Sequence, residues 1–298
     1  MLPAVEKNRA VQRAIMFALA EDIGAGDVTT SALVPRTARA RAVILSKGNY
    51  VVSGTTVART CFGRVSSRIV CRTLINDGAR VKRGQRVMQL EGPAGAILRA
   101  ERTALNFMQR MTGIASLTAE YVHQISKGVT TILDTRKTTP GLRVIEKYSV
   151  LCGGGGNHRF GLFDRVLIKD NHRAFLKSRD TTLATAVRIA RQRFPRLPVE
   201  IEVESLVELE DALQGNPDWV LLDNMSIELM RQCVKRCCGM ARVEASGGVS
   251  LVNVKAVSRT GVDAISVGAL THSAPAADLS LEFLESREQR SRSRTITT

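Results

Sequence analysis

The spacing of hydrophobic and polar positions changes near residue 112, which divides the chain into two parts. Residues 5–20 carry apolar side chains at helical spacing and predict an amphipathic helix, and residues 99–112 predict a second helix. Between them lie short β-type runs separated by glycines that mark turns, at 39–45, 50–53, 68–74 and 85–90. We therefore expect a mixed α/β domain over residues 1–112.

Short apolar strands alternate with helices from residue 113 onward, in what we expect to be a second domain over residues 113–274. The predicted strands are rich in Val, Ile and Leu, as buried parallel strands are, and lie at 130–134, 165–169, 198–204, 218–223, 241–245 and 263–267. The predicted helices include 181–194, 205–214, 226–237 and 251–260. A repeated strand–helix unit predicts a parallel sheet, which is either a barrel or a doubly wound sheet.

Polar residues and glycines follow nearly every one of these predicted strands. In chain order they are Asp134, Arg136 and Lys137; Lys169 and Asp170; Glu202 and Glu204; Asp223 and Asn224; Glu244, Ser246, Gly247 and Gly248; Ser266 and Gly268. In a barrel all strand ends meet at one face, where barrel enzymes have their active sites. A doubly wound sheet brings together only the ends beside its switch point. Polar groups at six strand ends therefore favour the barrel.

Basic residues and glycines concentrate in three segments, 134–138, 153–159 and 169–172. Together these segments contain two arginines, two lysines, two histidines and four consecutive glycines. Guanidinium groups bind carboxylates and phosphates through paired hydrogen bonds, and lysines act as point charges. This density of donors suits a small ligand that carries several negative charges.

Two further features of the strand ends indicate a phosphate and a metal ion. Residues 246–248 open a predicted helix and Gly268 follows the last strand, so backbone N–H groups at both places could bind a phosphate. Glu202 and Asp223 end neighbouring strands and could hold ribose hydroxyls or Mg²⁺. These features beside a carboxylate-binding pocket suggest phosphoribosyl transfer, in which an enzyme mainly positions reactants and stabilises a charged leaving group.

Each of these features has a plain structural explanation when it is taken alone. A lone lysine or arginine at a strand end is usually solvated or paired with a carboxylate. The glycine run 153–156 matches neither a P-loop nor a dinucleotide-binding fingerprint. One of Glu202 and Glu204 could be a buried ion-pair partner. Taken together at six successive strand ends, however, these residues favour a functional site.

Composition and charge narrow the class of protein. The chain has 298 residues, 44% of them hydrophobic, and no apolar run that approaches the length of a membrane span. A net charge of +15 fits either nucleic-acid binding or a basic cleft for anionic metabolites. Aromatic residues make up only 4%, and the dense basic segment 286–294 is most simply a solvated tail, so we expect no nucleic-acid partner.

The cysteines and the N-terminal residues indicate a cytoplasmic protein. None of the six cysteines forms a CxxC pair, and a chain of this size needs no disulfide framework, so reduced thiols are expected. The opening residues, MLPAVEKNR, lack the apolar core of a signal peptide. We therefore expect neither export nor a membrane partner.

Ten short strings follow one another between about residue 17 and residue 283. They are EDIGAGDVTT (21–30), ERTALN (101–106), DTRKTTPGLR (134–143), EKY (146–148), GGGGNHR (153–159), LIKDNH (167–172), EVE (202–204), LDN (222–224), EASGG (244–248) and SVGALTHS (266–273). Together they resemble the quinolinate phosphoribosyltransferase family. An ordered match of this length is far more specific than any single motif.

The resemblance implies a fold, an assembly and a reaction. The fold is α/β, with an N-terminal α/β sandwich, an incomplete seven-stranded parallel α/β barrel like that of type II phosphoribosyltransferases, and residues 275–298 packed back on the first domain. The assembly is a homodimer in which each active site borrows from the partner's N-terminal domain. The reaction joins quinolinate to phosphoribosyl pyrophosphate with Mg²⁺ as cofactor, giving nicotinate mononucleotide, pyrophosphate and CO₂ in de novo NAD biosynthesis.

The resemblance also implies which residues bind quinolinate. Arg136, His158 and Arg159 would line the pocket, and Arg102 would come from the other subunit. Leu151 departs from the pattern, because a basic residue is expected there in many relatives. If that basic residue helps to hold an anion, affinity would be weaker in this protein.

The remaining implied roles concern phosphoribosyl pyrophosphate and the metal ion. Lys137 and Lys169 would lie between the two substrates as catalytic residues. Glu202 and Asp223 would also be catalytic, facing the ribose and binding the metal. The 5-phosphate would be held by Ser246, Gly247, Gly248 and Gly268.

Two alternative functions remain open at this point. A paralogue associated with molybdenum transport has the same fold, but such relatives degrade the Lys-Asp-Asn-His motif, which is intact here at 169–172. A protein that binds RNA or DNA is the other alternative, and it rests on net charge alone.

Overall fold

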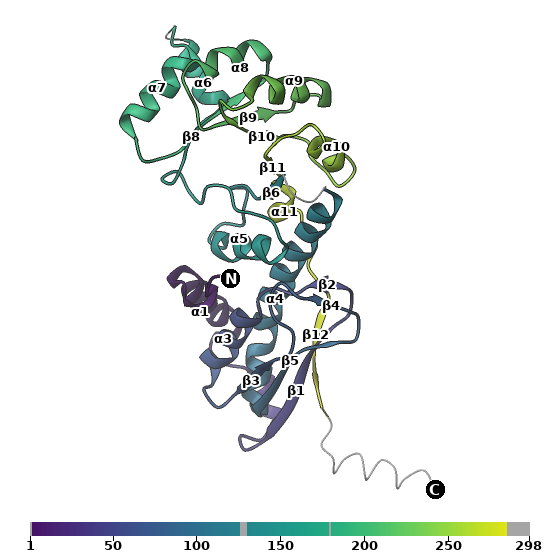
Figure 1. Ribbon diagram of the computed structural model, residues 1–298. Helices are drawn as coiled ribbons and strands as arrows, with labels where there is room; N and C mark the ends of the chain where they lie inside the picture. Colours follow the sequence, from purple (N-terminus) through teal and green to yellow (C-terminus); the bar gives the residue numbers. More distant parts are fainter. Residues whose placement is uncertain (1, 126–129, 179, 285–298) are drawn as a thin grey trace. The chain divides into compact units, whose positions relative to one another are not determined.

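The computed structural model describes residues 2–125, 130–178 and 180–284 (Figure 1). The described chain forms two compact units. The first unit comprises residues 2–116, 139–153 and 274–284, and the second comprises residues 117–138 and 154–273. The chain therefore enters the first unit three times.

A four-stranded antiparallel sheet forms the centre of the first unit. Its strands are β1 (Arg39–Ser46), β3 (Val70–Thr73), β5 (Arg86–Pro93) and β12 (Leu279–Phe283), in the order β12-β1-β5-β3. β1 is an inner strand, because it pairs with β5 on one side and with β12 on the other, where Ile44 lies opposite Leu281. A separate antiparallel pair joins β2 (Tyr50–Val51) to β4 (Arg80–Val81). The four predicted β-type runs correspond to β1, β2, β3 and β5.

The helices of the first unit include α1 (Arg9–Ile23), α2 (Val28–Leu33), α3 (Thr55–Val65) and α5 (Arg143–Cys152). α1 starts later than the predicted residue 5, because the side chain of Asn8 caps it by accepting a hydrogen bond from Ala10 N at 2.8 Å. Val11, Ile15 and Leu19 recur at one-turn spacing and are buried, as the amphipathic pattern predicted.

The helix α4 (Ala94–Gln124) extends the predicted helix 99–112 at both ends. It has 31 residues. No helix of the described chain, α4 included, is both long enough and apolar enough to cross a membrane. In the first unit, a Cβ atom on Gly113 of α4 would lie 2.0 Å from the carbonyl oxygen of Pro275. Only glycine therefore allows the chain that leads to β12 to cross α4 at this point.

The second unit contains a parallel sheet whose strands match the six predicted ones. They are β6 (Thr131–Leu133), β7 (Val166–Ile168), β8 (Val199–Val203), β9 (Trp219–Asp223), β10 (Arg242–Ser246) and β11 (Ala264–Ser266), in the order β6-β11-β10-β9-β8-β7. Beyond β6, Gly156 forms a parallel bridge to Leu133 and donates from its N–H to Ile132 O at 2.7 Å. Apart from β6 and β7 at the ends of the sheet, strands consecutive in the chain are neighbours, which is the cyclic order of an α/β barrel and not of a doubly wound sheet. Among the described residues no pairing joins Gly156 to β7, so the barrel is not closed.

The helices between these strands start at side-chain caps. Thr182, Ser205 and Ser226 each accept a hydrogen bond from the backbone N–H three residues later, at 3.2 Å in every case. The capped helices are α7 (Leu183–Arg193), α8 (Leu206–Leu213) and α9 (Ile227–Cys237), close to the predicted ranges. α6 (Asp170–Lys177) and α11 (Ala269–His272) were not predicted, and α10 (Val254–Ser258) is shorter than the predicted 251–260.

Candidate active site

The sequence-predicted site residues of the second unit lie at the carboxyl ends of its parallel strands. Lys137 follows β6, Lys169 follows β7, Glu202 is the next-to-last residue of β8 and Asp223 ends β9. Ser246 ends β10, and Gly268 follows β11. Because neighbouring parallel strands share one direction, these ends lie along the same edge of the sheet.

Glu202 and Asp223 form an acidic pair on neighbouring strands. Glu202 is buried and accepts a hydrogen bond from the backbone N–H of Asp170 at 3.1 Å. Burial raises the pKa of Glu202, and the negative charge of Asp223 raises it further, against the opposing effect of Lys169. The two carboxylates thus lie within electrostatic range of each other, and a bound cation would relieve their repulsion.

The loop after β10 is fixed by two asparagines. Gly247, with a positive φ of 85°, packs so closely on Asn224 that a Cβ atom would lie 2.2 Å from the Asn224 side-chain oxygen. The backbone N–H of Asn224 donates to Ser246 O at 3.0 Å, and Asn253 Nδ2 donates to Gly248 O at 3.0 Å. These contacts hold the predicted phosphate-binding loop beside Asp223, which Ser246 faces across the sheet.

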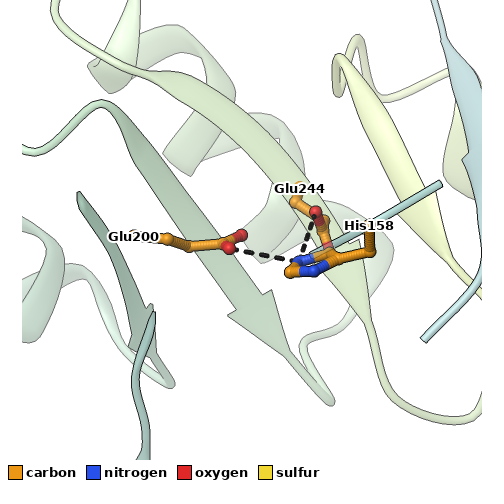
Figure 2. Close-up of side chains that lie close together, drawn as sticks. All are labelled: His158, Glu200 and Glu244. Carbon is orange, nitrogen blue, oxygen red and sulfur yellow. Dashed lines mark ion pairs between the residues drawn. The ribbon is translucent and has the colours of Figure 1, made fainter. Parts of the chain in front are cut away.

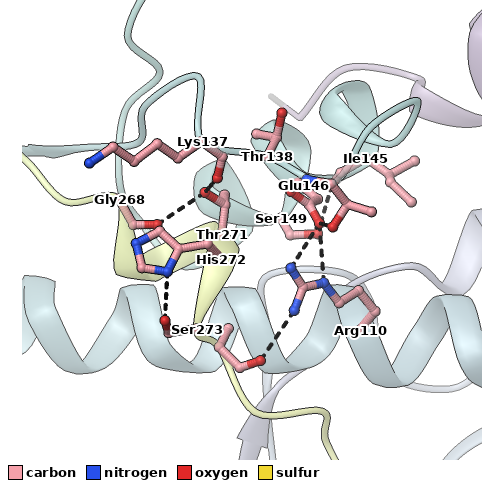
Figure 3. A network of polar contacts seen from close by, with 12 residues as sticks. Arg110, Lys137, Thr138, Ile145, Glu146, Ser149, Gly268, Thr271, His272 and Ser273 are labelled. Atoms are coloured by element: carbon pink, nitrogen blue, oxygen red, sulfur yellow. Dashed lines mark hydrogen bonds and ion pairs between the residues drawn. The ribbon is translucent and has the colours of Figure 1, made fainter.

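Lys137 and Gly268 are adjacent at the ends of β6 and β11. The hydroxyl of Thr271 donates to the carbonyl oxygen of Lys137 at 2.7 Å and also lies 3.2 Å from Gly268 O (Figure 3). Next to them, His272 Nδ1 lies 2.6 Å from the hydroxyl of Ser273. The backbone that carries Lys137 is therefore held by a residue of α11.

Asp134 organises the segment that carries His158 and Arg159. Its carboxylate accepts from the side chain of Asn157 at 2.7 Å and from the backbone N–H of His158 at 2.9 Å. The guanidinium of Arg159 donates to Arg165 O at 3.3 Å. Burial lowers the pKa of Arg159, and the nearby positive charge of Arg136 lowers it further.

Arg136 and Arg159 lie within electrostatic range of each other, and we call them the cationic pair. A bound anion would offset their mutual repulsion. The structure thus brings together Arg136 and Arg159, two of the residues predicted to bind quinolinate. A third, His158, is the residue before Arg159 in the chain.

The ring of His158 is buried between two glutamates (Figure 2). Its Nε2 lies 3.1 Å from Oε2 of Glu200 on β8 and 3.4 Å from Oε2 of Glu244 on β10. Arg165 Nη1 also donates to Oε2 of Glu200, at 3.1 Å. Sequence reasoning assigned His158 to the ligand pocket and did not identify Glu200.

The first unit also contains a buried carboxylate that pairs with an arginine, Glu146. It accepts hydrogen bonds from the backbone N–H of Thr139 at 3.1 Å and from the Thr139 hydroxyl at 2.7 Å. Arg110 donates to it from Nε at 3.1 Å and from Nη2 at 2.9 Å, and Arg110 Nη1 donates to Ala274 O at 3.2 Å (Figure 3). Glu146 was recognised only as part of a family string, without a role.

Arg102 is the predicted site residue that belongs to the first unit. It is exposed on α4, in the first unit of the chain. Its predicted role in a partner's active site stays a prediction.

Comparison with known proteins identifies the family. A sequence profile described as "Quinolinate phosphoribosyl transferase, N-terminal domain" matches residues 27–112, and one described as "Quinolinate phosphoribosyl transferase, C-terminal domain" matches residues 114–282. The chain belongs to the quinolinate phosphoribosyltransferase family. The resemblance found from ten short strings is therefore confirmed.

Members of this family from several bacteria are similar to the chain along most of its length. The nicotinate-nucleotide pyrophosphorylase [carboxylating] of Mycobacterium leprae is 40% identical over 282 residues, which are 92% of this chain and 97% of that protein. A probable nicotinate-nucleotide pyrophosphorylase of Bacillus subtilis is 37% identical over 269 residues, covering 90% and 91% of the two chains. The solved nicotinate-nucleotide pyrophosphorylase of Francisella tularensis superposes with a TM-score of 0.87 at 37% identity, over 95% of this chain and 100% of that one.

Proposed function

We propose that this protein transfers the phosphoribosyl group of phosphoribosyl pyrophosphate to quinolinate and releases CO₂, pyrophosphate and nicotinate mononucleotide. Membership of the quinolinate phosphoribosyltransferase family over both units is the observation that carries this proposal. The cationic pair of Arg136 and Arg159 supports it, because quinolinate is a dicarboxylate. The intact Lys-Asp-Asn-His motif argues against the molybdenum-associated alternative.

The residues of the second unit suggest how the reaction proceeds. The arginines of the cationic pair bind the substrate carboxylates and direct the pyridine nitrogen at the anomeric carbon. As the new C–N bond forms, the bond from that carbon to pyrophosphate breaks, and Lys137 and Lys169 offset the charge of the leaving group. The ring nitrogen becomes cationic. When the adjacent C–CO₂ bond breaks and CO₂ leaves, its electron pair stays on the ring carbon, where the neighbouring cationic nitrogen stabilises it, and solvent then protonates that carbon. No residue has to act as a general base.

We propose Mg²⁺ as the metal cofactor, held by Glu202 and Asp223. Magnesium prefers oxygen ligands, and the acidic pair offers two carboxylates whose repulsion a dication would offset. Bound there, Mg²⁺ would stabilise the developing charge of pyrophosphate. The same carboxylates would hold the ribose hydroxyls.

We also propose a homodimer in the cytoplasm, with Arg102 of each chain entering the partner's active site. The exposure of Arg102 on α4 is consistent with contact to a second copy. All six cysteines are free thiols, which fits a reducing compartment.

The test of the proposed function is an assay of nicotinate mononucleotide formation. We expect turnover of quinolinate with phosphoribosyl pyrophosphate and Mg²⁺, little or no turnover of nicotinate, and no turnover in excess EDTA until Mg²⁺ is restored. Comparable rates with nicotinate would show that the pocket does not select a dicarboxylate. Full activity in excess chelator would contradict the metal assignment.

A further inference from the structure

Asp134 follows β6 and is a buried residue whose carboxylate reaches the segment 154–159. It has 0% of its surface exposed. Its Oδ1 accepts the backbone N–H of His158 at 2.9 Å, and its Oδ2 accepts the side-chain amide of Asn157 at 2.7 Å. Burial of a carboxylate costs stability unless hydrogen bonds compensate it, so these two contacts strongly constrain the segment that makes them.

Backbone pairing between β6 and this segment is short. Within the described residues it consists of one parallel bridge between Leu133 and Gly156, with Gly156 N donating to Ile132 O at 2.7 Å and Asp134 N donating to Gly156 O at 3.3 Å. In a longer parallel pairing the N–H of His158 would donate next to the backbone oxygen of Asp134. Here it donates to the side-chain oxygen of the same residue, so the carboxylate extends a pairing that the backbone forms at a single position.

The two joined segments each carry one arginine of the cationic pair. Asp134 lies two residues before Arg136, and Asn157 lies two residues before Arg159. A slip of one residue would move one segment along the other by about 3.3 Å. The contact between Asp134 and Asn157 therefore controls the distance between the two guanidinium groups.

The other hydrogen bonds around Lys137 are local to its own turn. Lys137 N donates to the Thr135 hydroxyl at 3.0 Å, and Thr138 N donates to Arg136 O at 2.9 Å. Such bonds give the turn its shape but do not set its position relative to the segment 154–159. Asp134 provides a connection that does.

We propose that Asp134 is a positioning residue that, through Asn157 and the backbone of His158, sets the separation of Arg136 and Arg159. This separation selects a substrate whose two carboxylates are on neighbouring ring carbons, as they are in quinolinate. Asp134 acts through the arginines and does not touch the substrate. The selection rests on the proposed function, because it takes the cationic pair as the group that binds quinolinate.

An exchange of the two side chains tests the contact. Asn157→Asp faces one carboxylate with another where a carboxylate and an amide are now 2.7 Å apart, and it should raise the KM for quinolinate at least about tenfold. Adding Asp134→Asn restores a complementary pair. The amide at position 134 accepts the His158 N–H through its oxygen and donates through its nitrogen to the carboxylate at position 157. The double variant should have a KM within about threefold of the native value.

Two further measurements separate positioning from general damage to the fold. The KM for phosphoribosyl pyrophosphate should stay within about twofold in both variants. Phthalate and isophthalate carry two carboxylates at different spacings on an unreactive ring, so calorimetry with each measures selection without turnover. The native protein should prefer phthalate at least about tenfold, Asn157→Asp should lose most of this preference, and the double variant should regain it.

Two control variants make the same chemical changes at exposed positions. Asn49→Asp alters a side chain of the first unit whose oxygen accepts Arg83 N at 3.1 Å, and it should leave both KM values unchanged. Asp180→Asn removes an exposed carboxylate of the second unit and should not rescue Asn157→Asp. Rescue by Asp180→Asn would show that only net charge matters, which would overturn the proposal.

Hydrogen exchange followed by mass spectrometry tests the positioning without any substrate. Peptides that cover residues 154–159 should exchange faster in Asn157→Asp than in the native protein and at the native rate in the double variant. A native protein that binds neither quinolinate nor phthalate would overturn the proposed function and the selection, whereas exchange restored by the double variant would still support the positioning role.

The double variant decides the outcome even where the single variant fails to fold. If Asn157→Asp does not fold, a folded double variant with a near-native KM supports the contact equally well. A double variant no better than Asn157→Asp in KM and in exchange would overturn the proposal. So would an equal rise in the KM values for both substrates.

Discussion

The side chain of Lys137 lies across Gly268, so closely that a Cβ atom on Gly268 would come within 3.0 Å of Lys137 Cδ. The same Cβ atom would lie 3.2 Å from Nε2 of His272. The glycine after β11 therefore leaves the space that the lysine after β6 occupies. Gly268 is predicted to bind phosphate, and Lys137 is predicted to offset the charge of the leaving group. The two residues therefore limit each other's position directly.

Gly268→Ala should displace the Lys137 side chain by a few tenths of an ångström and lower kcat by about tenfold, because catalytic geometry tolerates little displacement. The fold should persist, since the methyl group meets the flexible part of a lysine. Gly63→Ala is the control, because nothing lies within 4 Å of a Cβ atom there. Steady-state kinetics of both variants make the comparison, and equal kcat values would show that Lys137 does not depend on Gly268.

Glu146→Gln should reduce the stability of the first unit. The change leaves the Arg110 guanidinium without its carboxylate, and Arg110 is partly exposed, so we expect a loss of about 2–3 kcal/mol in the free energy of unfolding. Urea denaturation is the measurement. Glu228→Gln removes an exposed ion pair with Arg231 and should cause no clear change. Equal unfolding midpoints for the two variants would contradict the role given to Glu146.

Arg136→Lys should weaken quinolinate binding by about 1.5–3 kcal/mol, because an ammonium group cannot form the paired hydrogen bonds of a guanidinium. Binding of phosphoribosyl pyrophosphate should change much less. Isothermal titration calorimetry with each ligand separates the two effects. Equal losses for both ligands would place Arg136 outside the quinolinate pocket.

Glu202 should make stability depend on pH. Burial gives this carboxyl a higher pKa in the folded protein than in the unfolded chain, so its ionisation on raising the pH opposes folding. The favourable contribution is complete below the unfolded pKa, at about pH 4, and is lost as the pH rises through the folded pKa.

Glu202→Gln should therefore raise the melting temperature of the metal-free protein near neutral pH and leave it unchanged near about pH 4. Differential scanning calorimetry in EDTA at both pH values is the measurement. The variant should also lose most of its activity, because the same carboxylate is assigned to the ribose and the metal. A lower melting temperature at neutral pH would mean that Glu202 stabilises the fold.

Arg102 permits a test of the shared active site by subunit exchange. Arg102→Ala and Lys169→Ala homodimers should each be nearly inactive. In a mixed dimer, one of the two sites would receive Arg102 from one chain and Lys169 from the other, so mixing the inactive proteins should restore part of the activity. Native mass spectrometry confirms exchange. If mixed dimers form and no activity returns, Arg102 acts within its own chain.

Local patterns were enough to predict the parallel sheet, because its strands are short, apolar and punctuated by polar residues at their carboxyl ends. They were also enough to predict α7, α8 and α9, whose caps Thr182, Ser205 and Ser226 have a sequence signature. The helix α6 was missed, since its start depends on His172, whose ring accepts the backbone N–H of Lys169 at 3.0 Å.

The buried polar residues were harder to predict than the strand ends. Alternation along β8 puts Glu200 and Glu202 on one face, but only the packed structure shows that Glu200 meets His158 and Arg165. Glu146 acts through Thr139 and Arg110, which come from different parts of the sequence. Such roles depend on contacts between residues that are far apart in the chain, and a local sequence pattern cannot predict these contacts.

The position of β12 has a consequence for how the protein is made. β1 lies between β5 and β12, so a ribosome completes most of the first unit long before it supplies that unit's last strand. Until residues 279–283 emerge, the hydrogen-bonding groups of β1 that later pair with β12 are an open edge, which invites pairing with other chains. The nascent chain, and any fragment that ends near residue 112, should therefore need protection from aggregation that the finished protein does not.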